Sequence, residues 1–413
     1  MIGIANPTGW DLDRLGPARD FLEESVARAH LLRVIPDLRD GALRLLDYRA
    51  ERLDVHGESV SLQGLVLVRD AVTGAAEVRS VRFGTDAGGR LVVRLSPDDP
   101  ELPVLAELLG AGGAERIAAA VAEGSLAGAP TARLVAHRFG RRAALRLTLP
   151  GPGGAPGQPR DLLVKVYAGA RGEGVAAVLA WLAGRTDAIP ATVPRLRHRD
   201  ESRGLLAVDW LPGECAHDRL LRGGAVETDA IGRAVRGLQM AAPPLPHYGV
   251  AEELATIRKF VARVRMVRPG LGRRLESAAR AAADRATNGD GAPRRLAHRD
   301  LHDKQVVCMS NGPGLIDWDL AADSPRALDP GNFIAHLRLR ALQRRLSPRQ
   351  AAGERRAFLE GYGNGAGSAP PSEIELWERL TLLRLAAVYG LRPGWNGLPS
   401  RLLAASSFGE EAV

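Results

Sequence analysis

Cysteine, lysine and aromatic residues are scarce in this sequence. The two cysteines, Cys215 and Cys308, are too few for a disulfide framework or a four-cysteine zinc site, which favours a reducing cytoplasm. No run approaches the roughly eighteen apolar residues of a membrane-spanning helix, and residues 1–7 lack the basic and apolar regions of a secretory signal. The composition, 45% hydrophobic and 25% charged, is that of a globular protein, so we expect no membrane partner.

The positive charge comes almost entirely from arginine, because the chain has only three lysines, Lys165, Lys259 and Lys304. The formal net charge is +8, but the arginines are spread along the chain rather than gathered into an arm. This distribution argues against nucleic acid as a partner. A basic protein is on average a poor host for a cationic substrate, so a neutral sugar, an acidic metabolite or an acidic peptide would suit it better.

Hydrophobic periodicity divides the first part of the chain into a helix, a sheet and further helices. Apolar residues at helical spacing predict a helix over residues 17–30. Alternating or continuous apolar runs then predict an antiparallel sheet of four strands, over residues 43–48, 60–68, 76–83 and 91–95. Alanine- and leucine-rich helices follow over residues 102–123. We take residues 1–125 as an N-terminal accessory domain.

Strand patterns resume after residue 125 and give way to helices after residue 213. Residues 126–213 are predicted to contain strands over residues 132–136, 143–149 and 161–167, an apolar helix over 172–184 and a further strand from 205. Residues 214–413 are predicted to be a helical domain, with helices over residues 230–240, 251–267, 272–284, 348–362, 372–389 and 398–405.

The most informative stretch is a polar run from His298 to Gln305, which follows an apolar approach and leads into a short strand. A strong turn signal, Asn-Gly-Pro-Gly at residues 311–314, then precedes a second strand that runs into Asp317. Two strands joined in this way form a hairpin, which would bring Asp300 and Asp317 to the same end. One carboxylate could orient an attacking hydroxyl and take its proton while the other holds magnesium, as in phosphoryl transfer.

These paired motifs resemble the H-x-D-x-x-x-x-N loop and the following D-x-D/E turn of the aminoglycoside phosphotransferase, choline kinase and maltokinase group, relatives of the protein kinases. The resemblance covers about residues 130–390. It implies an α+β, protein-kinase-like bilobal fold, with a β-rich small lobe and a helical large lobe, here preceded by an N-terminal α/β accessory domain. It also implies ATP and Mg2+ as cofactors.

The resemblance assigns roles in the large lobe. Asp300 matches the catalytic base, next to the loop histidine His298, and Asp317 matches the magnesium aspartate. Gln305 stands where most of the family has a metal-ligating asparagine, and its carboxamide offers the same acceptor oxygen on a longer stem. His302 occupies the position of a second family histidine, which either touches the γ-phosphate or braces the loop.

Two further matches concern segments expected to lie next to the predicted catalytic loop, residues 298–305. Asp329 opens a helix and is predicted to cap it and to brace the loop. Residues 137–142 stand in the place of the phosphate-covering loop, with one glycine instead of three. Arg141 and Arg142 in this loop either approach phosphates or lie in solvent.

The nucleotide would meet the small lobe through a lysine and a hinge. Lys165, a rare lysine within an apolar strand, resembles the kinase lysine that contacts α- and β-phosphates; the alternative is a lysine that extends into solvent from an edge strand. Glu173 is the candidate ion-pair partner of Lys165, although the apolar positions of the helix put Val175 in that place, and a solvated first-turn glutamate is the alternative. The hinge that meets adenine is predicted at Val208, Asp209 and Leu211.

Three functions remain open at this point. The first is transfer of the γ-phosphate to a hydroxyl of a small molecule such as a sugar, an amino alcohol or an antibiotic. The second is phosphorylation of serine or threonine hydroxyls in a lanthipeptide-like precursor peptide, which the N-terminal sheet could bind by strand addition. The third is a pseudokinase scaffold, suggested by the altered Gln305 and the doubtful Glu173.

Overall fold

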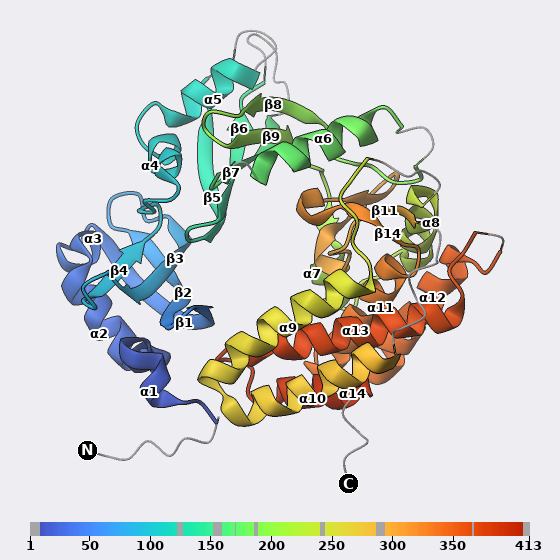
Figure 1. The fold of residues 1–413 in the computed structure, drawn as a ribbon. Helices are drawn as coiled ribbons and strands as arrows, with labels where there is room; N and C mark the ends of the chain where they lie inside the picture. Colours follow the sequence, from blue (N-terminus) through green and yellow to red (C-terminus); the bar gives the residue numbers. More distant parts are fainter. Residues whose placement is uncertain are drawn as a thin grey trace.

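The computed structural model describes residues 9–121, 126, 128–151, 159–169, 171–185, 189–239, 244–285, 294–365 and 367–407. Two antiparallel sheets and a helical body lie in a ring (Figure 1). The predicted α+β fold, with a β-rich small lobe, a helical large lobe and an additional N-terminal sheet, is therefore confirmed. Among the described residues, every helix is too short or too polar to cross a lipid bilayer.

The N-terminal segment differs from the single helix that we predicted over residues 17–30. It forms α1 (Leu12–Leu15), a 3-10 helix (Gly16–Leu22), α2 (Glu24–Val34) and α3 (Pro36–Arg39). Glu23 has extended backbone angles, φ −91° and ψ 123°, so the chain turns between the 3-10 helix and α2. This turn places Phe21 against Phe83 of the first sheet, with ring centroids 4.2 Å apart.

The first sheet has the predicted antiparallel topology, in the order β1-β2-β3-β4. Its strands are β1 (Leu43–His56), β2 (Ser59–Asp70), β3 (Ala76–Thr85) and β4 (Leu91–Leu95). The helices that follow, α4 (Pro103–Leu109) and α5 (Gly113–Val121), do not share the core of this sheet. Leu105 and Ile117 pack in one buried cluster with Leu145 and Val164 of the second sheet. The domain boundaries at residues 125 and 213 stay predictions, and residue 125 lies outside the described residues.

The second sheet has the order β5-β6-β7-β9-β8. Its strands are β5 (Thr131–Arg138), β6 (Arg142–Leu149), β7 (Arg160–Tyr167), β8 (Leu196–Asp200) and β9 (Leu205–Asp209), and α6 (Arg171–Ala183) lies beside them. Lys165 pairs with Ala144 of β6 on one side and Leu206 of β9 on the other. Lys165 therefore belongs to a central strand, and the edge-strand alternative is wrong.

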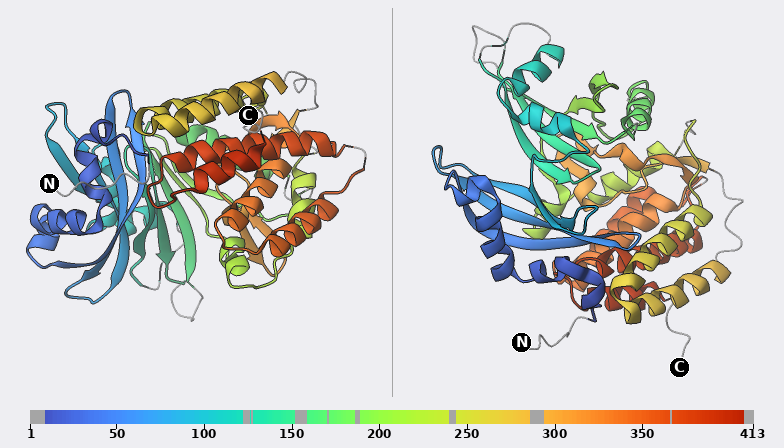
Figure 2. Two further views of the ribbon diagram at one scale, coloured as in Figure 1. Left: turned by 90° about the horizontal axis from the view of Figure 1, so that it is seen from below. Right: turned by 60° about the vertical axis from the view of Figure 1, so that its left-hand side comes forward.

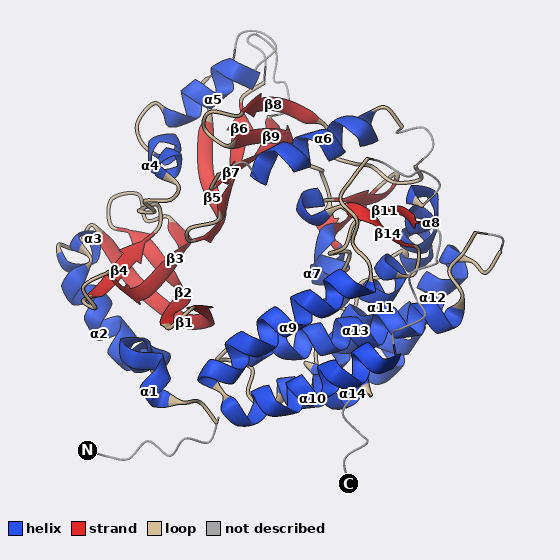
Figure 3. Ribbon diagram, viewed as in Figure 1, coloured by secondary structure: helices blue, strands red, loops and turns tan. Residues whose placement is uncertain are grey.

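The large lobe is helical, with three short strand pairings inserted at its upper end (Figure 3). Its helices are α7 (Ala216–Leu221), α8 (Thr228–Leu238), α9 (Val250–Val267), α10 (Pro269–Arg285), α11 (Leu328–Leu342), α12 (Pro348–Tyr362), α13 (Pro371–Gly390) and α14 (Leu398–Ser406). Strands β12 (Val306–Met309) and β13 (Gly312–Leu315) form the predicted hairpin, and β12 also pairs with β10 (Glu214–Cys215). The last pair is β11 (Arg294–Ala297) with β14 (Ala322–Pro325).

The first sheet contacts both lobes. On one side, the backbone N–H of Leu53 donates to the carbonyl of Leu391 at 2.8 Å, just after α13. On the other side, Gln63 and Ser80 donate to the carbonyl of His137 in β5, at 3.0 and 3.1 Å. Both views in Figure 2 place the blue strands against one end of the helical body. The sheet thus closes the ring on the side away from the hinge.

Candidate active site

The predicted catalytic loop, residues 298–305, follows β11 and is held by one buried carboxylate. Asp329, 1% exposed, accepts hydrogen bonds from the backbone N–H groups of His298, at 2.7 Å, and Arg299, at 2.9 Å. Helix α11 begins at Leu328 after Ala327, so Asp329 lies in the first turn and is not the cap that we predicted. Its predicted bracing role is present. Burial raises the pKa of Asp329 despite these bonds.

Arg299 has a backbone conformation that normally favours glycine. Its φ of +67° lies in the left-handed region, which is strained for a side chain with a Cβ. The Arg299 guanidinium stacks on Tyr248, 3.3 Å from the ring centroid, and donates to the carbonyl of Leu320 at 3.2 Å. These contacts, together with the Asp329 bond, stabilise the strained backbone.

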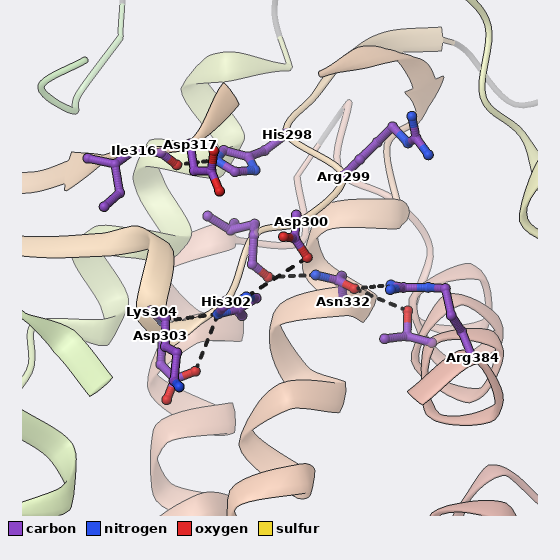
Figure 4. A network of polar contacts seen from close by, with 12 residues as sticks. His298, Arg299, Asp300, His302, Asp303, Lys304, Ile316, Asp317, Asn332 and Arg384 are labelled. Carbon is purple, nitrogen blue, oxygen red and sulfur yellow. Dashed lines mark hydrogen bonds and ion pairs between the residues drawn. The ribbon is translucent and has the colours of Figure 1, made fainter. Parts of the chain in front are cut away.

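His298 connects the catalytic loop to the turn that carries Asp317. Its side chain is fully buried, and Nε2 donates to the carbonyl of Ile316 at 2.7 Å (Figure 4). Asp317 follows directly and adopts a left-handed conformation, with φ +63°. His298 therefore fixes the distance between Asp300 and Asp317 rather than facing the cavities itself.

Asp300 lies beside His302 in the loop. Nε2 of His302 is 3.9 Å from Oδ1 of Asp300, and Nδ1 accepts a hydrogen bond from the backbone N–H of Lys304 at 3.1 Å. The ring of His302 stacks on His336, with centroids 4.3 Å apart. Figure 4 shows Asp300 between His302 and the turn of Asp317. The geometry supports the loop-bracing role of His302 and leaves its Nε2 directed at the carboxylate.

Two polar networks beneath the loop were not predicted. Asn332 of α11 donates to the carbonyl of Leu301 at 2.8 Å and accepts from Arg384 at 2.7 Å (Figure 4). Arg384 also donates to Glu253 at 2.8 Å. These residues come from three different helices, and no local pattern in the sequence marks them as neighbours of the loop.

The second network is centred on Asp303, which is 2% exposed. Arg340 donates two hydrogen bonds of 2.8 Å to its carboxylate, and His217 makes a further bond through Nδ1. Burial would raise the pKa of Asp303, but the neighbouring His217, His302 and Arg340 side chains lower it well below its usual value. Asp303 thus fixes the loop to α11 and α7 as an ionised, paired carboxylate.

A cluster of opposite charges joins the two lobes. Lys165 Nζ lies 2.6 Å from Oδ1 of Asp317 and also bonds to Asp319. Arg142 of β6 donates to both carboxyl oxygens of Asp317, at 3.3 Å each, and to Asp319. Tyr167 donates to Asp319 at 3.0 Å. The structure thus brings the predicted Lys165 and Asp317 together and adds Arg142 and Asp319.

The charges in this cluster favour the ionised form of the metal-site candidate. Burial opposes ionisation of Asp317, but Lys165 and Arg142 outweigh burial, so the pKa of Asp317 lies below its usual value. Asp319 was part of the predicted D-x-D turn, and its spacing was the signal that could have identified it. Arg142 was expected either to approach phosphates or to lie in solvent, and no signal in the sequence linked it to Asp317 and Asp319.

Glu173 does not take the place that we predicted. It is exposed on α6, and the ion pairs of Lys165 among the described residues are with Asp317 and Asp319. Val175, two residues further on, is buried and lines the cavity next to Lys165. The helix therefore presents an apolar side chain where a glutamate was expected, as its apolar pattern had suggested.

A cavity of about 580 Å³ lies between the lobes and carries the features of a nucleotide site. The predicted hinge residues Val208, Asp209 and Leu211 line one end, and Lys165 and Asp317 line the other. Its remaining walls are largely apolar and include Ala144, Leu163, Leu179, Leu206, Val307 and Ile316. An apolar slot that ends in charged groups fits a flat base joined to phosphates.

Gln305 also lines this cavity, and its backbone is fixed at both ends of the residue. Its N–H donates to the carbonyl of His302 at 2.8 Å, and its carbonyl accepts from the N–H of Ile316 at 3.0 Å. The side chains of Gln305, Asp317 and Asp319 offer only oxygen acceptors for a cation. That donor set fits magnesium, which prefers carboxylate and amide oxygens.

A second cavity of about 510 Å³ adjoins the first and contains Asp300. Asp317 and Gln305 line both cavities, so the two sites meet at the metal-site candidate. The walls of the second cavity come mainly from α9, α11 and α13 and include Tyr248, Glu253, Phe260, Trp377 and Leu385. Asp317 therefore lies where the nucleotide-shaped slot meets a separate, more polar cavity, and Asp300 lies in that second cavity.

Comparison with known proteins agrees with this geometry. The sequence model of the phosphotransferase enzyme family matches residues 154–372, more than half of the chain. The chain belongs to this family. As a member of the phosphotransferase family, it is a kinase-type enzyme with a hydroxyl acceptor and a protein-kinase-like bilobal fold, as the motifs predicted. No curated protein sequence matches the chain.

Solved structures of several kinases are similar to this member of the family. A choline kinase from Streptococcus pneumoniae is 13% identical, with 68% of this chain and 92% of that chain covered and a TM-score of 0.44. A glucosamine kinase in complex with glucosamine, ADP and inorganic phosphate is 19% identical, with 87% and 94% covered and a TM-score of 0.44. An aminoglycoside phosphotransferase from Streptomyces rimosus, in complex with ADP and streptomycin, is 17% identical, with 60% and 90% covered and a TM-score of 0.42.

Proposed function

We propose that this phosphotransferase uses ATP and magnesium to phosphorylate a hydroxyl of a small molecule. The observation that carries the proposal is the contact of Lys165 with Asp317 across the lobes, at 2.6 Å, at the point where the cavity that holds Asp300 meets the apolar slot. An ammonium, two acidic side chains and an amide oxygen are the groups that phosphoryl transfer requires in one place.

In this mechanism each residue has a separate task. The adenine lies in the slot near Val208 and Leu211, and Lys165 binds the nonterminal phosphates. Asp317, Asp319 and Gln305 would hold the magnesium, which neutralises charge on the phosphates when it is bound. Asp300 orients the acceptor hydroxyl and accepts its proton. The hydroxyl oxygen then bonds to the γ-phosphorus while the bond to the β-phosphate oxygen breaks and ADP leaves.

The test is transfer of labelled γ-phosphate to a panel of hydroxyl compounds, together with binding of a fluorescent ATP analogue. We expect Asp300→Asn to lower kcat by about a hundredfold or more while nucleotide binding changes less than about twofold, because general-base and positioning effects act mainly in the transition state. Asp37→Asn, at an exposed aspartate of α3, is the matched control. Unchanged transfer in Asp300→Asn would refute the proposal.

The same assay addresses the two alternatives. A scaffold would bind the nucleotide and show no transfer that depends on Asp300. A precursor-peptide kinase would transfer phosphate to serine or threonine peptides encoded near the gene and leave the small molecules unlabelled.

A further inference from the structure

The cavity that contains Asp300 is rich in positive charge. Seven arginines and Lys304 line it, against three carboxylates, Glu253, Asp300 and Asp317. An excess of guanidinium groups around a concave site concentrates anions there and repels cations. The excess matters only if these arginines are not already neutralised by the protein.

Four of the seven arginines are engaged within the protein. Arg340 is paired with Asp303, and Arg384 is paired with Glu253. Arg142 binds the carboxylates of the metal-site candidate, and Arg299 stacks on a tyrosine and donates to a backbone carbonyl. These four contribute to the architecture of the loop and the metal turn.

The other three are Arg138 at the end of β5, Arg141 in the β5–β6 turn and Arg392 just after α13. Arg392 stacks on Tyr389, 4.5 Å from the ring centroid. Among the described residues, none of the three guanidinium groups has a hydrogen bond or an ion pair. They come from two lobes and converge on one cavity. Burial lowers the pKa of nearby Arg52, and repulsion from Arg141 and Arg392 lowers it further. Burial also lowers the pKa of Arg138 to about 10, and repulsion from Arg52 contributes to this, so the three arginines share one positive field around Arg52. Gathering like charges in this way costs stability unless an anion binds between them.

The nucleotide does not account for two of these arginines. Arg138 lines both cavities and is within reach of ATP phosphates. Arg141 and Arg392 line the cavity of Asp300 and not the apolar slot. His336 also lines this cavity, and neither of its ring nitrogens has a hydrogen-bond partner among the described residues. Both observations favour a polar ligand in the cavity that contains Asp300, where the acceptor would bind.

We infer that the acceptor carries an anionic group, a carboxylate or a phosphate ester, which Arg141 and Arg392 bind while Asp300 faces its hydroxyl. This inference rests on the proposed kinase function and adds the class of substrate. The cavity of about 510 Å³ is within the range of small-ligand sites, roughly 300–1,000 Å³, so the acceptor is a small hydroxylated acid or sugar phosphate rather than a cationic amino alcohol or aminoglycoside.

The first experiment measures anion binding without turnover. The full chain is saturated with magnesium and a non-hydrolysable ATP analogue, and inorganic phosphate is titrated by calorimetry. We expect saturable binding that Arg392→Ala and Arg141→Ala each weaken at least tenfold. Arg349→Ala, at an exposed arginine of α12, leaves binding unchanged. Absence of saturable binding, or equal binding by Arg392→Ala, overturns the inference.

The second experiment varies ligand charge at constant shape. Glucuronate, glucose and glucosamine share a pyranose ring and differ in charge, and each is used to displace phosphate from the loaded protein. We expect glucuronate to displace it at least tenfold more effectively than the other two. Equal or better displacement by glucosamine overturns the inference, as does displacement by an acidic serine peptide but by none of the sugars. If phosphate binds but Asp300→Asn still transfers phosphate normally, the kinase mechanism fails and the anion site stands.

Discussion

Arg142 and Asp317 are 175 residues apart in the chain, yet the arginine makes two hydrogen bonds of 3.3 Å to the carboxylate. Arg142 is the last residue of the predicted phosphate-covering loop and the first of β6, and Asp317 lies in the turn after β13. The arginine therefore occupies the oxygen atoms that would coordinate magnesium. Binding of the metal with its nucleotide requires Arg142 to exchange these oxygens for other partners.

This exchange predicts that Arg142 competes with magnesium. Arg142→Ala should bind magnesium in the absence of nucleotide about tenfold more tightly, because one positive charge is removed from beside Asp317 and Asp319. Calorimetric titration with magnesium chloride measures the effect. Arg142→Lys keeps the charge and is the control, with an affinity close to that of the wild type. Equal magnesium affinity in Arg142→Ala and the wild type would show that the arginine does not block the site.

Lys165 should affect both stability and nucleotide binding. Lys165→Met keeps the shape and removes the charge, which leaves Asp317 and Asp319 with Arg142 as their remaining cation. Breaking a buried ion pair costs about 3–5 kcal/mol, and the remaining arginine puts the expected loss near the lower end. Urea unfolding measures it.

The chain offers a matched control for this variant, because Lys259 is exposed on α9. Lys259→Met should change the free energy of unfolding by less than about 0.5 kcal/mol. ATP affinity should fall at least tenfold in Lys165→Met and stay constant in Lys259→Met. If the two variants bound ATP equally, Lys165 would not contact the phosphates.

Asp303 and Asp317 predict loss of stability in acid. The pKa of each is lowered in the folded protein, so their contribution is fully present above the unfolded value of about 3.9 and is lost as the pH falls through the folded values. The free energy of unfolding should therefore fall steeply below about pH 4.

The variant Asp303→Asn tests how much Asp303 contributes to the pH dependence of the free energy of unfolding. The variant should be less stable at pH 7, because Arg340 and His217 lose their anionic partner, and its stability should depend less on pH below about 4. Asp37→Asn should follow the wild-type curve in parallel. If the free energy of unfolding of Asp303→Asn fell with pH as steeply as that of the wild type, the pKa of Asp303 would not be lowered in the folded protein. Unfolding followed by circular dichroism at several pH values gives these slopes.

The segment that follows β4 should influence the predicted phosphate-covering loop through Asp99. This buried carboxylate is 2.9 Å from Nε2 of His137 and accepts from the backbone N–H of Gly140 at 2.8 Å. Asp99→Ala frees both groups, so amide hydrogen exchange at Gly140 should accelerate and KM for ATP should rise more than kcat falls. Asp98→Ala, which changes the exposed neighbour paired with Arg94, should leave both unchanged. If Asp99→Ala left amide hydrogen exchange at Gly140 unchanged, Asp99 would not stabilise the loop.

Much of this architecture was predictable because the signals are local. The period of apolar residues predicted the four strands of the first sheet, four of the five strands of the second and most helices of the large lobe. The turn at residues 311–314 predicted the β12–β13 hairpin. The N-terminal helix was the exception, since the break at Glu23 depends on how Phe21 packs against the sheet. Glu173 was wrong for a different reason, because it came from the family resemblance, whereas the local apolar pattern of α6 correctly favoured Val175.

The sequence by itself determined that Asp300 and Asp317 would share one end of a hairpin, since their spacing and the turn between them are properties of a short segment. Only the tertiary structure decided that Arg142 and Lys165 reach Asp317, that Asp303 is held by Arg340 and His217, and that Arg392 faces the cavity of Asp300. These groups are separated by tens to hundreds of residues. Their meeting depends on how two sheets and a helical body pack around one another, which no local pattern encodes.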